Sequence, residues 1–271
     1  MFIDEVCKKS RFSKLQKSSL FSSLNDDEKY LYRFVDDYLK DYCNFFEISV
    51  EDVHDIRDRF SADYSNDIRN FIETGKYPYK LTSGLQRNLD RIEYDVILIS
   101  SYLLEKHRFA MLKWLALKKF SDKSILAVGV GPGVEIGVIL DFLGCSCVIE
   151  GYDLDFSDYV SNRYGDKIRK ELFLGSNEKF NVVILIEVLE HLSNPFELLN
   201  ACSKSMVKNG HLYATTAIDI PQFDHLYNFK VNEILELLKR CELNLVEIKK
   251  IEHGTILSKI NSINEVVEAV K

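Results

Sequence analysis

The sequence after Ser121 alternates short β-rich runs with helical runs, and this alternation limits the fold more than any other feature. The β-rich runs are Ile125–Val128, Cys147–Tyr152, Val182–Ile186, His211–Thr216 and Asn244–Ile251. Between them, apolar residues recur at helical spacing in segments of about ten residues. Strands that alternate with such helices form βαβ units, in which helices cover both faces of a parallel sheet. The sequence therefore predicts an α/β fold with a Rossmann-like doubly wound sheet.

Residues 1–120 have a helical period instead and contain no strand-like run. Asn25 with Glu28 forms a capping box, Ser49 caps a second helix, and Gly75 ends a third. Apolar positions indicate helices that include residues 31–42, 53–60, 68–72, 85–103 and 106–118. We therefore predict two domains, a helical N-terminal subdomain over residues 1–120 and the Rossmann-like domain over residues 121–271.

The composition limits the class of partner. Hydrophobic residues make up 46% of the 271 residues and charged residues 28%, as in globular proteins. The net charge of -7 argues against a nucleic-acid partner, since such proteins usually carry a basic face. No apolar run reaches the ~18 residues of a membrane span, and the six cysteines show no metal-binding spacing. We expect a cytoplasmic protein with free thiols, no metal site and no membrane partner.

Three glycines, Gly129, Gly131 and Gly133, follow the first β-rich run at intervals of two residues. In a doubly wound sheet, ligands bind beyond the carboxyl ends of the strands, and glycine there lets the backbone contact a ligand without an intervening Cβ. The dinucleotide fingerprint Gly-x-Gly-x-x-Gly does not match, since Val134 or Ile136 stands at its third glycine. No Gly-Lys-Ser/Thr follows, which excludes a P-loop. The spacing predicts a ligand-binding turn of another kind.

Three segments resemble motifs of the class I S-adenosylmethionine (SAM)-dependent methyltransferases, in the order and spacing of that family. They are Ile125–Gly133, similar to the first motif; Phe180–Leu192, which runs into Val-Leu-Glu-His as in the small-molecule branch; and Met206–Tyr213, similar to the turn before the fifth strand and the strand itself. The resemblance covers about Ser124–Ile251. It implies the class I methyltransferase fold, SAM as the cofactor, and transfer of a methyl group to a small molecule.

The resemblance also implies how SAM would be bound. Its methionine part would lie against Gly129, Gly131 and Gly133, and its ribose hydroxyls would bind Asp153, at the end of the second β-rich run. Asp153 falls 22 positions after Gly131, near the interval of about 20 residues at which an acidic residue reaches a ribose in such sheets. Asp155 is the near alternative.

Three further cofactor-binding residues follow from the resemblance, and Ala127 is among the positions that depart from it. Leu174 would line the adenine pocket, and Ile186 and Glu187 would face the methionine and the sulfonium. Ala127 stands where the family usually has an acidic residue that holds the SAM amino group. Glu135, in the first turn of the next helix, either substitutes for that residue or is a favourable charge at a helix N-terminus.

The candidate catalytic residues are Glu187 and His191, after the fourth strand, and His225, after the fifth. Methyl transfer is an in-line displacement, so the enzyme mainly positions the acceptor, with a general base where the nucleophile carries a proton. Glu190 and Asp224 lie beside the two histidines and could raise their basicity. Alternatively, these residues only shape their loops. The other four histidines receive no role, and the N-terminal helices are expected to cover the pocket as a lid.

Three functions stay open at this point. The first is a SAM-dependent methyltransferase that acts on an oxygen, nitrogen or sulfur atom of a small molecule. The second uses the same SAM site but transfers or cyclises the aminocarboxypropyl arm and releases methylthioadenosine. The third is a non-catalytic SAM-fold module that binds a macromolecular partner. The residues indicate neither the acceptor nor the oligomeric state.

Overall fold

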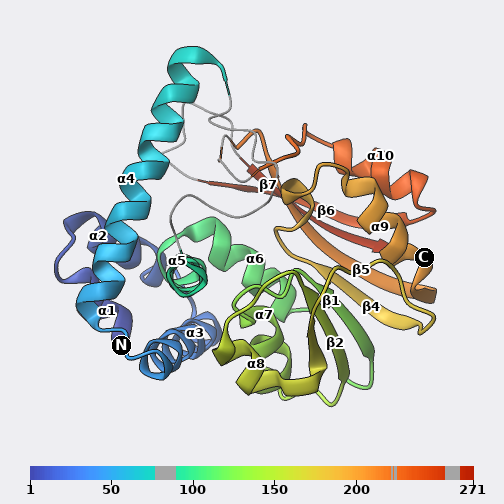
Figure 1. Ribbon diagram of the computed structural model, residues 1–271, viewed down its shortest axis with the longest axis horizontal. Coiled ribbons are helices and arrows are strands. Elements are labelled where there is room, and N and C mark those ends of the chain that lie inside the picture. Colours follow the sequence, from blue (N-terminus) through green and yellow to red (C-terminus); the bar gives the residue numbers. More distant parts are fainter. Residues whose placement is uncertain (77–89, 221, 223–224, 254–262) are drawn as a thin grey trace.

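The computed structural model describes residues 1–76, 90–220, 222, 225–253 and 263–271. The N-terminal part is helical, as predicted. Its helices are α1 (Phe2–Cys7), α2 (Arg11–Phe21), α3 (Asp26–Phe45), α4 (Val50–Thr74), α5 (Arg91–Leu104) and α6 (Lys106–Ala116). α1–α5 lie on the left in Figure 1, and the sheet lies on the right.

The helix ends follow the predicted caps, but α4 differs from the prediction. Capping boxes open α3 at Asn25 and α4 at Ser49, and α4 ends at Gly75, whose φ of +66° suits a helix C-cap. However, α4 is one continuous helix, not two. Residues 61–67 contain no glycine or proline, so nothing in the backbone interrupts the helix there. α5 begins at Arg91, and the earlier part of its predicted range lies outside the described residues.

A seven-stranded sheet forms the second half of the molecule. Its strands are β1 (Ser124–Val128), β2 (Val148–Asp153), β3 (Ile168–Lys170), β4 (Phe180–Leu185), β5 (Met206–Ile218), β6 (Asn244–Glu252) and β7 (Ile263–Val270). Their order is β3-β2-β1-β4-β5-β7-β6. The chain moves outward from β1 to β3 and then returns to the other side of β1 with β4. The strand order therefore reverses between β1 and β4, where such sheets bind ligands.

The sheet is mixed, whereas the sequence predicted a parallel one. β7 lies between β5 and β6 and is antiparallel to both. This strand is also absent from the predicted β-rich runs. The other pairs, from β3 to β5, are parallel.

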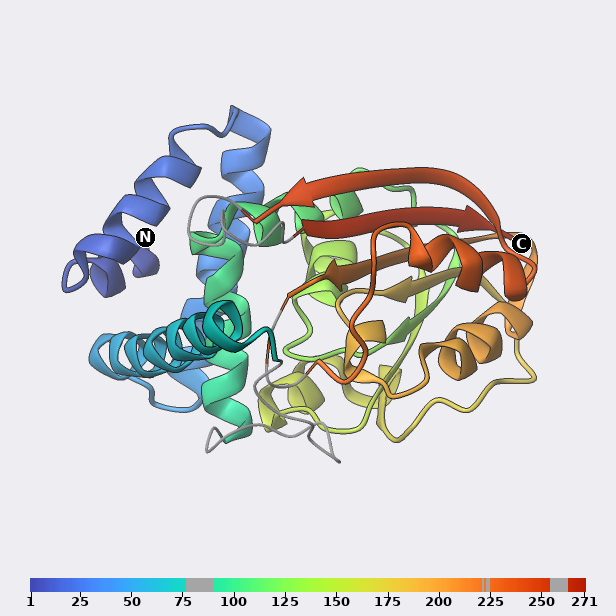
Figure 2. The same cartoon turned by 90° about the horizontal axis from the view of Figure 1, so that it is seen from above.

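Short helices connect the strands. They are α7 (Val134–Gly137), which continues as the π-helix η1 (Val138–Phe142); α8 (Asp158–Tyr164); the 3-10 turns η2 (Gly165–Lys167) and η3 (Leu189–His191); α9 (Pro195–Lys204); and α10 (Glu233–Arg240). Figure 2 shows α9 and α10 on one side of the sheet. None of the helices among the described residues is both long and apolar enough to span a membrane.

Alternate residues of the strands enter two separate apolar cores. Ile125 and Ala127 of β1 belong to a core shared with α3, α5, α6, α7 and α8. Leu126 and Val128 belong to the opposite core, shared with α9 and α10. This alternation follows from the two-residue period of a strand, and the helices on the two faces of the sheet bury both sets of side chains. The N-terminal helices therefore share one core with the sheet, and a domain boundary near residue 120 stays a prediction.

Candidate cofactor and acceptor site

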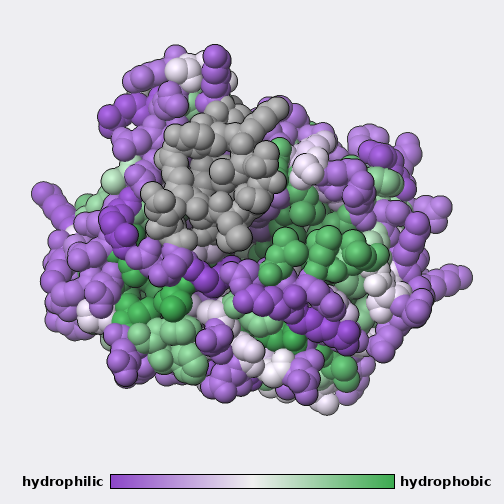
Figure 3. All heavy atoms as spheres, viewed as in Figure 1, coloured by the Kyte–Doolittle hydropathy of each residue, from purple (hydrophilic) through white to green (hydrophobic). Residues whose placement is uncertain are grey.

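A cavity of about 1550 Å³ lies at the carboxyl ends of β1, β2 and β4. Its walls come from the glycine turn after β1, from the ends of β2 and β4, and from α5 and α6. The cavity thus occupies the point where the strand order reverses, as expected for a ligand site in an open α/β sheet. On the face shown in Figure 3, apolar residues gather on both the helical and the sheet parts, between margins of polar residues.

All three positions of the glycine turn favour glycine, and two of them are also crowded by neighbouring side chains. All three residues have positive φ, of +77° at Gly129, +52° at Gly131 and +77° at Gly133. A Cβ at Gly129 would lie 2.3 Å from the Cγ2 atom of Val188, and one at Gly133 would lie 2.7 Å from the ring of Tyr164. A Cβ at Gly131 would meet no atom of the described residues within 4 Å. The bare backbone of Gly131 therefore borders the open cavity, as a cradle for a ligand requires.

Two buried tyrosines are hydrogen-bonded to the backbone of the glycine turn. The hydroxyl of Tyr38, on α3, donates to the carbonyl of Pro132 at 2.7 Å, and that of Tyr164, on α8, donates to the carbonyl of Gly133 at 2.9 Å. The two hydroxyl oxygens are 3.3 Å apart. Burial raises the pKa of both tyrosines, so both hydroxyls stay protonated. An N-terminal helix thus fixes the turn directly, which no predicted site residue indicated.

Asp153 ends β2 beside the glycine turn. Its Oδ2 accepts a hydrogen bond from the N–H of Gly131 at 2.7 Å, and its Oδ1 accepts one from the N–H of Asp155 at 3.1 Å. The carboxylate of Asp155 is paired instead with the Nζ of Lys170, at 2.5 Å. Both acidic residues line the cavity, but only Asp153 is bound to the turn. Leu174, after β3, also lines the cavity and is 80% exposed.

Glu187 follows β4 and is held in an unusual backbone conformation. Its φ is +54°, which residues other than glycine rarely adopt. Its N–H donates to the Oγ1 of Thr215 at 2.9 Å, and its Oε1 accepts from that Oγ1 at 2.8 Å and from the Nδ2 of Asn264 at 2.7 Å. The position of the Glu187 side chain therefore depends on residues of β5 and β7. Together with Ile186, Glu187 lines the cavity, and that the two residues face the methionine and the sulfonium stays a prediction.

A chain of polar contacts continues from Glu187 across the cavity wall. The Nη1 of Arg108, on α6, lies 3.5 Å from its Oε2. The guanidinium of Arg108 lies 4.8 Å over the ring of Tyr102, on α5, whose hydroxyl donates to the carboxylate of Glu135. Burial raises the pKa of Glu135. A buried hydrogen bond thus connects Glu135, on α7 beside the glycine turn, to the N-terminal helices.

Two histidines that are not among the predicted site residues also line the cavity. The rings of His107, on α6, and His253, after β6, stack with their centroids 3.7 Å apart. A ring nitrogen of His253 is hydrogen-bonded to the side-chain oxygen of Asn264. Burial lowers the pKa of both histidines. The stack joins α6 to the antiparallel strands, a contact between segments almost 150 residues apart that local sequence does not indicate.

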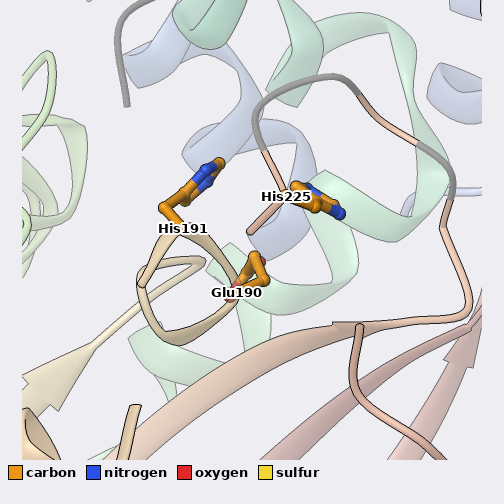
Figure 4. Close-up of side chains that lie close together, drawn as sticks. All are labelled: Glu190, His191 and His225. Carbon is orange, nitrogen blue, oxygen red and sulfur yellow. The ribbon is translucent and has the colours of Figure 1, made fainter. Parts of the chain in front are cut away.

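The candidate catalytic histidines lie together with Glu190. Figure 4 shows Glu190 and His191 on the turn after β4 and His225 on the segment that follows β5. The two imidazole rings meet edge to face, with centroids 5.2 Å apart. Glu190 is fully buried, and burial, together with the nearby charge of Glu187, raises its pKa to about 8. The predicted neighbour of His225, Asp224, lies outside the described residues.

Comparison with known proteins agrees with this geometry. A profile described as a methyltransferase domain matches residues 102–243, just over half of the 271 residues. No curated protein matches the sequence.

Two solved structures with this fold illustrate the likeness. The pyocyanin biosynthetic protein PhzM is 14% identical, with 78% of this chain and 71% of that chain covered and a TM-score of 0.56. A SAM-dependent methyltransferase from Aquifex aeolicus is 14% identical, with 68% and 99% covered and a TM-score of 0.50. At these identities the two structures show the fold, and the matching profile shows the family. The chain therefore belongs to the class I SAM-dependent methyltransferases, and its cofactor is SAM.

Proposed function

We propose that the protein transfers the methyl group of SAM to an oxygen, nitrogen or sulfur atom of a cytoplasmic small molecule. The observation that supports this most is the cavity at the glycine turn. Its volume of about 1550 Å³ exceeds the 300 to 1,000 Å³, roughly, of common ligand pockets. It therefore has room for an acceptor beside the cofactor. The net charge of -7 supports a small molecule rather than a nucleic acid.

The residues at the glycine turn fit the cofactor. The bare backbone at Gly131 would receive the methionine part, and Asp153 would accept hydrogen bonds from the ribose hydroxyls. One oxygen of Asp153 already accepts from the Gly131 N–H, so the carboxylate and the turn are aligned before any ligand arrives. Leu174 and Ile186 line the same cavity and would contact the adenine and the methionine. When bound, SAM supplies an electrophilic methyl carbon on a positively charged sulfur.

The acceptor would lie toward α5 and α6, between the glycine turn and the turn after β4. Tyr102 and Arg108 form the helical wall there, and Glu187 and His191 form the wall on the sheet side. These side chains exclude water and orient the nucleophile in line with the methyl group, which is the main demand of this displacement. Where the nucleophile is a hydroxyl or an amine, its proton must pass to a base. Glu187, His191 and His225 are the candidates for that role.

A product analysis tests the proposal. The purified protein is incubated with SAM and a small-molecule cell extract, and the sulfur-containing products are identified by mass spectrometry. We expect S-adenosylhomocysteine together with one compound in which a methyl group has replaced a hydrogen atom, so that its mass increases by one CH2 unit. Methylthioadenosine in its place would identify aminocarboxypropyl chemistry. SAM binding without either product, over a range of extracts, would instead favour a binding module.

A further inference from the structure

Glu190, His191 and His225 bring three metal-ligand side chains to one point. Each offers one ligand atom, and these atoms all lie within 4.8 Å of one another. Glu190 and His191 are neighbours on η3, whereas His225 comes from the segment after β5, so the fold brings them together. The backbone supports this approach, because the N–H of Tyr227 donates to the carbonyl of Glu190 at 2.9 Å.

The carboxylate of Glu190 is only partly satisfied by the residues that the structure describes. Its Oε1 is buried and accepts no hydrogen bond from any of them. Its Oε2 is 3.5 Å from the Oγ1 of Thr216, the outer limit of a hydrogen bond. The residue as a whole has 0% of its surface exposed. A buried carboxyl group with so few partners costs free energy unless a cation or a donor satisfies it.

The three side chains have the chemistry of a transition-metal site. Two imidazoles and one carboxylate bind ions such as Mn²⁺, Fe²⁺ or Zn²⁺, whereas Mg²⁺ and Ca²⁺ prefer oxygen ligands alone. With bonds of about 2.1 Å, two ligands of one ion lie about 3 to 4 Å apart. The observed separations therefore require the side chains to approach by about 1 Å, and His191 is only partly buried.

We propose that Glu190, His191 and His225 bind one divalent transition-metal ion at the acceptor end of the cavity. This replaces the prediction of a chain without a metal site, which was based on cysteine spacing alone. Both histidines line the cavity, so the ion would be open to a ligand from that side. The ion would also place a positive charge beside the buried carboxylate of Glu190.

The position of the ion limits the chemical class of the acceptor molecule, and this inference rests on the proposed function. Three protein ligands leave coordination positions for other groups, and oxygen atoms fill such positions in catalytic sites. The acceptor would therefore present a hydroxyl or a carbonyl oxygen beside the methyl group. The two imidazoles would then be metal ligands and not proton acceptors, and the ion would lower the pKa of a bound hydroxyl group.

Metal binding can be measured without turnover, so its failure is distinct from failure of the proposed function. The tag-free, full-length protein is first stripped with a chelator. Equilibrium dialysis then measures Mn²⁺ and Zn²⁺ separately, with and without S-adenosylhomocysteine. We expect one ion per chain. His191→Ala and His225→Ala should each weaken binding at least tenfold, as should Glu190→Gln.

The matched control is His211→Ala. His211 also pairs with a carboxylate, at 2.9 Å from Glu268, but it lies on β5 outside the cavity. This variant should bind the ion as the unaltered chain does. Circular dichroism and S-adenosylhomocysteine binding show whether Glu190→Gln folds, and the two histidine variants decide the matter if it does not. No bound ion, or binding that both histidine variants retain, would overturn the proposal.

Discussion

The backbone N–H of Gly131 donates a hydrogen bond to the carboxylate of Asp153 at 2.7 Å, across the gap between β1 and β2. This contact couples the two elements that the cofactor needs, the bare turn and the acidic strand end. Since both are fixed before binding, little conformational entropy remains to be lost there when a ligand arrives.

Asp153→Asn should weaken SAM binding by roughly tenfold to a hundredfold, because a hydrogen bond to a charged group contributes about 1.5–3 kcal/mol. The amide keeps the shape of the side chain but removes its charge and one acceptor. Isothermal titration calorimetry with SAM and S-adenosylhomocysteine measures the change. Asp155→Asn is the matched control, because that carboxylate pairs with Lys170. A larger loss of affinity in Asp155→Asn than in Asp153→Asn would show that Asp155, and not Asp153, binds the ribose.

Gly131→Ala should abolish SAM binding while the protein still folds. The new Cβ meets no protein atom within 4 Å, so it would enter the space assigned to the cofactor. Gly144→Ala controls for backbone strain, because Gly144 has a similar φ of +59°, equal space around it, and no place in the cavity. Both variants should lose stability by about 1–2 kcal/mol, from the left-handed conformation alone. Thermal unfolding and ligand titration separate the two effects, and equal SAM binding by both variants would contradict the assignment.

Tyr38→Phe should lower both the stability and the SAM affinity. It leaves the carbonyl of Pro132 without its buried donor, a loss of about 1–3 kcal/mol of unfolding free energy. The glycine turn then loses its link to α3 and becomes less ordered. Tyr30→Phe on the same helix is the control, because Tyr30 is 66% exposed. Denaturant unfolding and SAM titration of both variants check this, and a Tyr38→Phe protein with unchanged affinity would show that α3 does not position the turn.

Local sequence predicted the sheet strands β1, β2, β4, β5 and β6 because strand period, turn residues and caps are encoded within a few residues of each other. It placed Gly129, Gly131, Asp153 and Ile186 on one cavity for the same reason, since the carboxyl ends of neighbouring parallel strands meet at one edge. Gly133 belongs to the same turn, but it packs against Tyr164 and is not among the residues that line the cavity. The individual roles of these residues toward SAM stay predictions.

The missed features all depend on contacts between distant segments. β7 was not recognised, and its antiparallel pairing places Asn264 beside Glu187. Tyr38 has the helical spacing of an ordinary core residue, and nothing near it in the sequence indicates Pro132 as its partner. Burial of Glu190, which makes a metal site worth proposing, likewise appears only when η3 packs against β5. Tertiary packing decides these contacts, and the spacing of residues does not reveal it.

The stack of His107 and His253 predicts how stability depends on pH. The pKa of His107 lies well below its usual value of 6.5, because of burial and then because of the nearby His253 and Arg108. Its Nδ1 is buried and has no hydrogen bond to any residue that the structure describes. Glu105, whose Oε2 lies 3.6 Å from the Nε2 of His107, would favour the charged ring, but burial outweighs this contact.

Below about pH 6.5 the unfolded chain therefore binds protons on these histidines that the folded chain does not. Stability should accordingly fall as the pH decreases from about 6.5, by up to about 1.4 kcal/mol per pH unit for each histidine. His107→Phe keeps an aromatic ring in the stack but cannot be protonated, so its unfolding free energy should fall less steeply over this range. Urea unfolding at several values between pH 5 and pH 7 gives both slopes. Equal slopes for His107→Phe and the unaltered chain would mean that His107 takes up its proton equally in both states, and the buried, neutral stack would then be the wrong description of this side of the cavity.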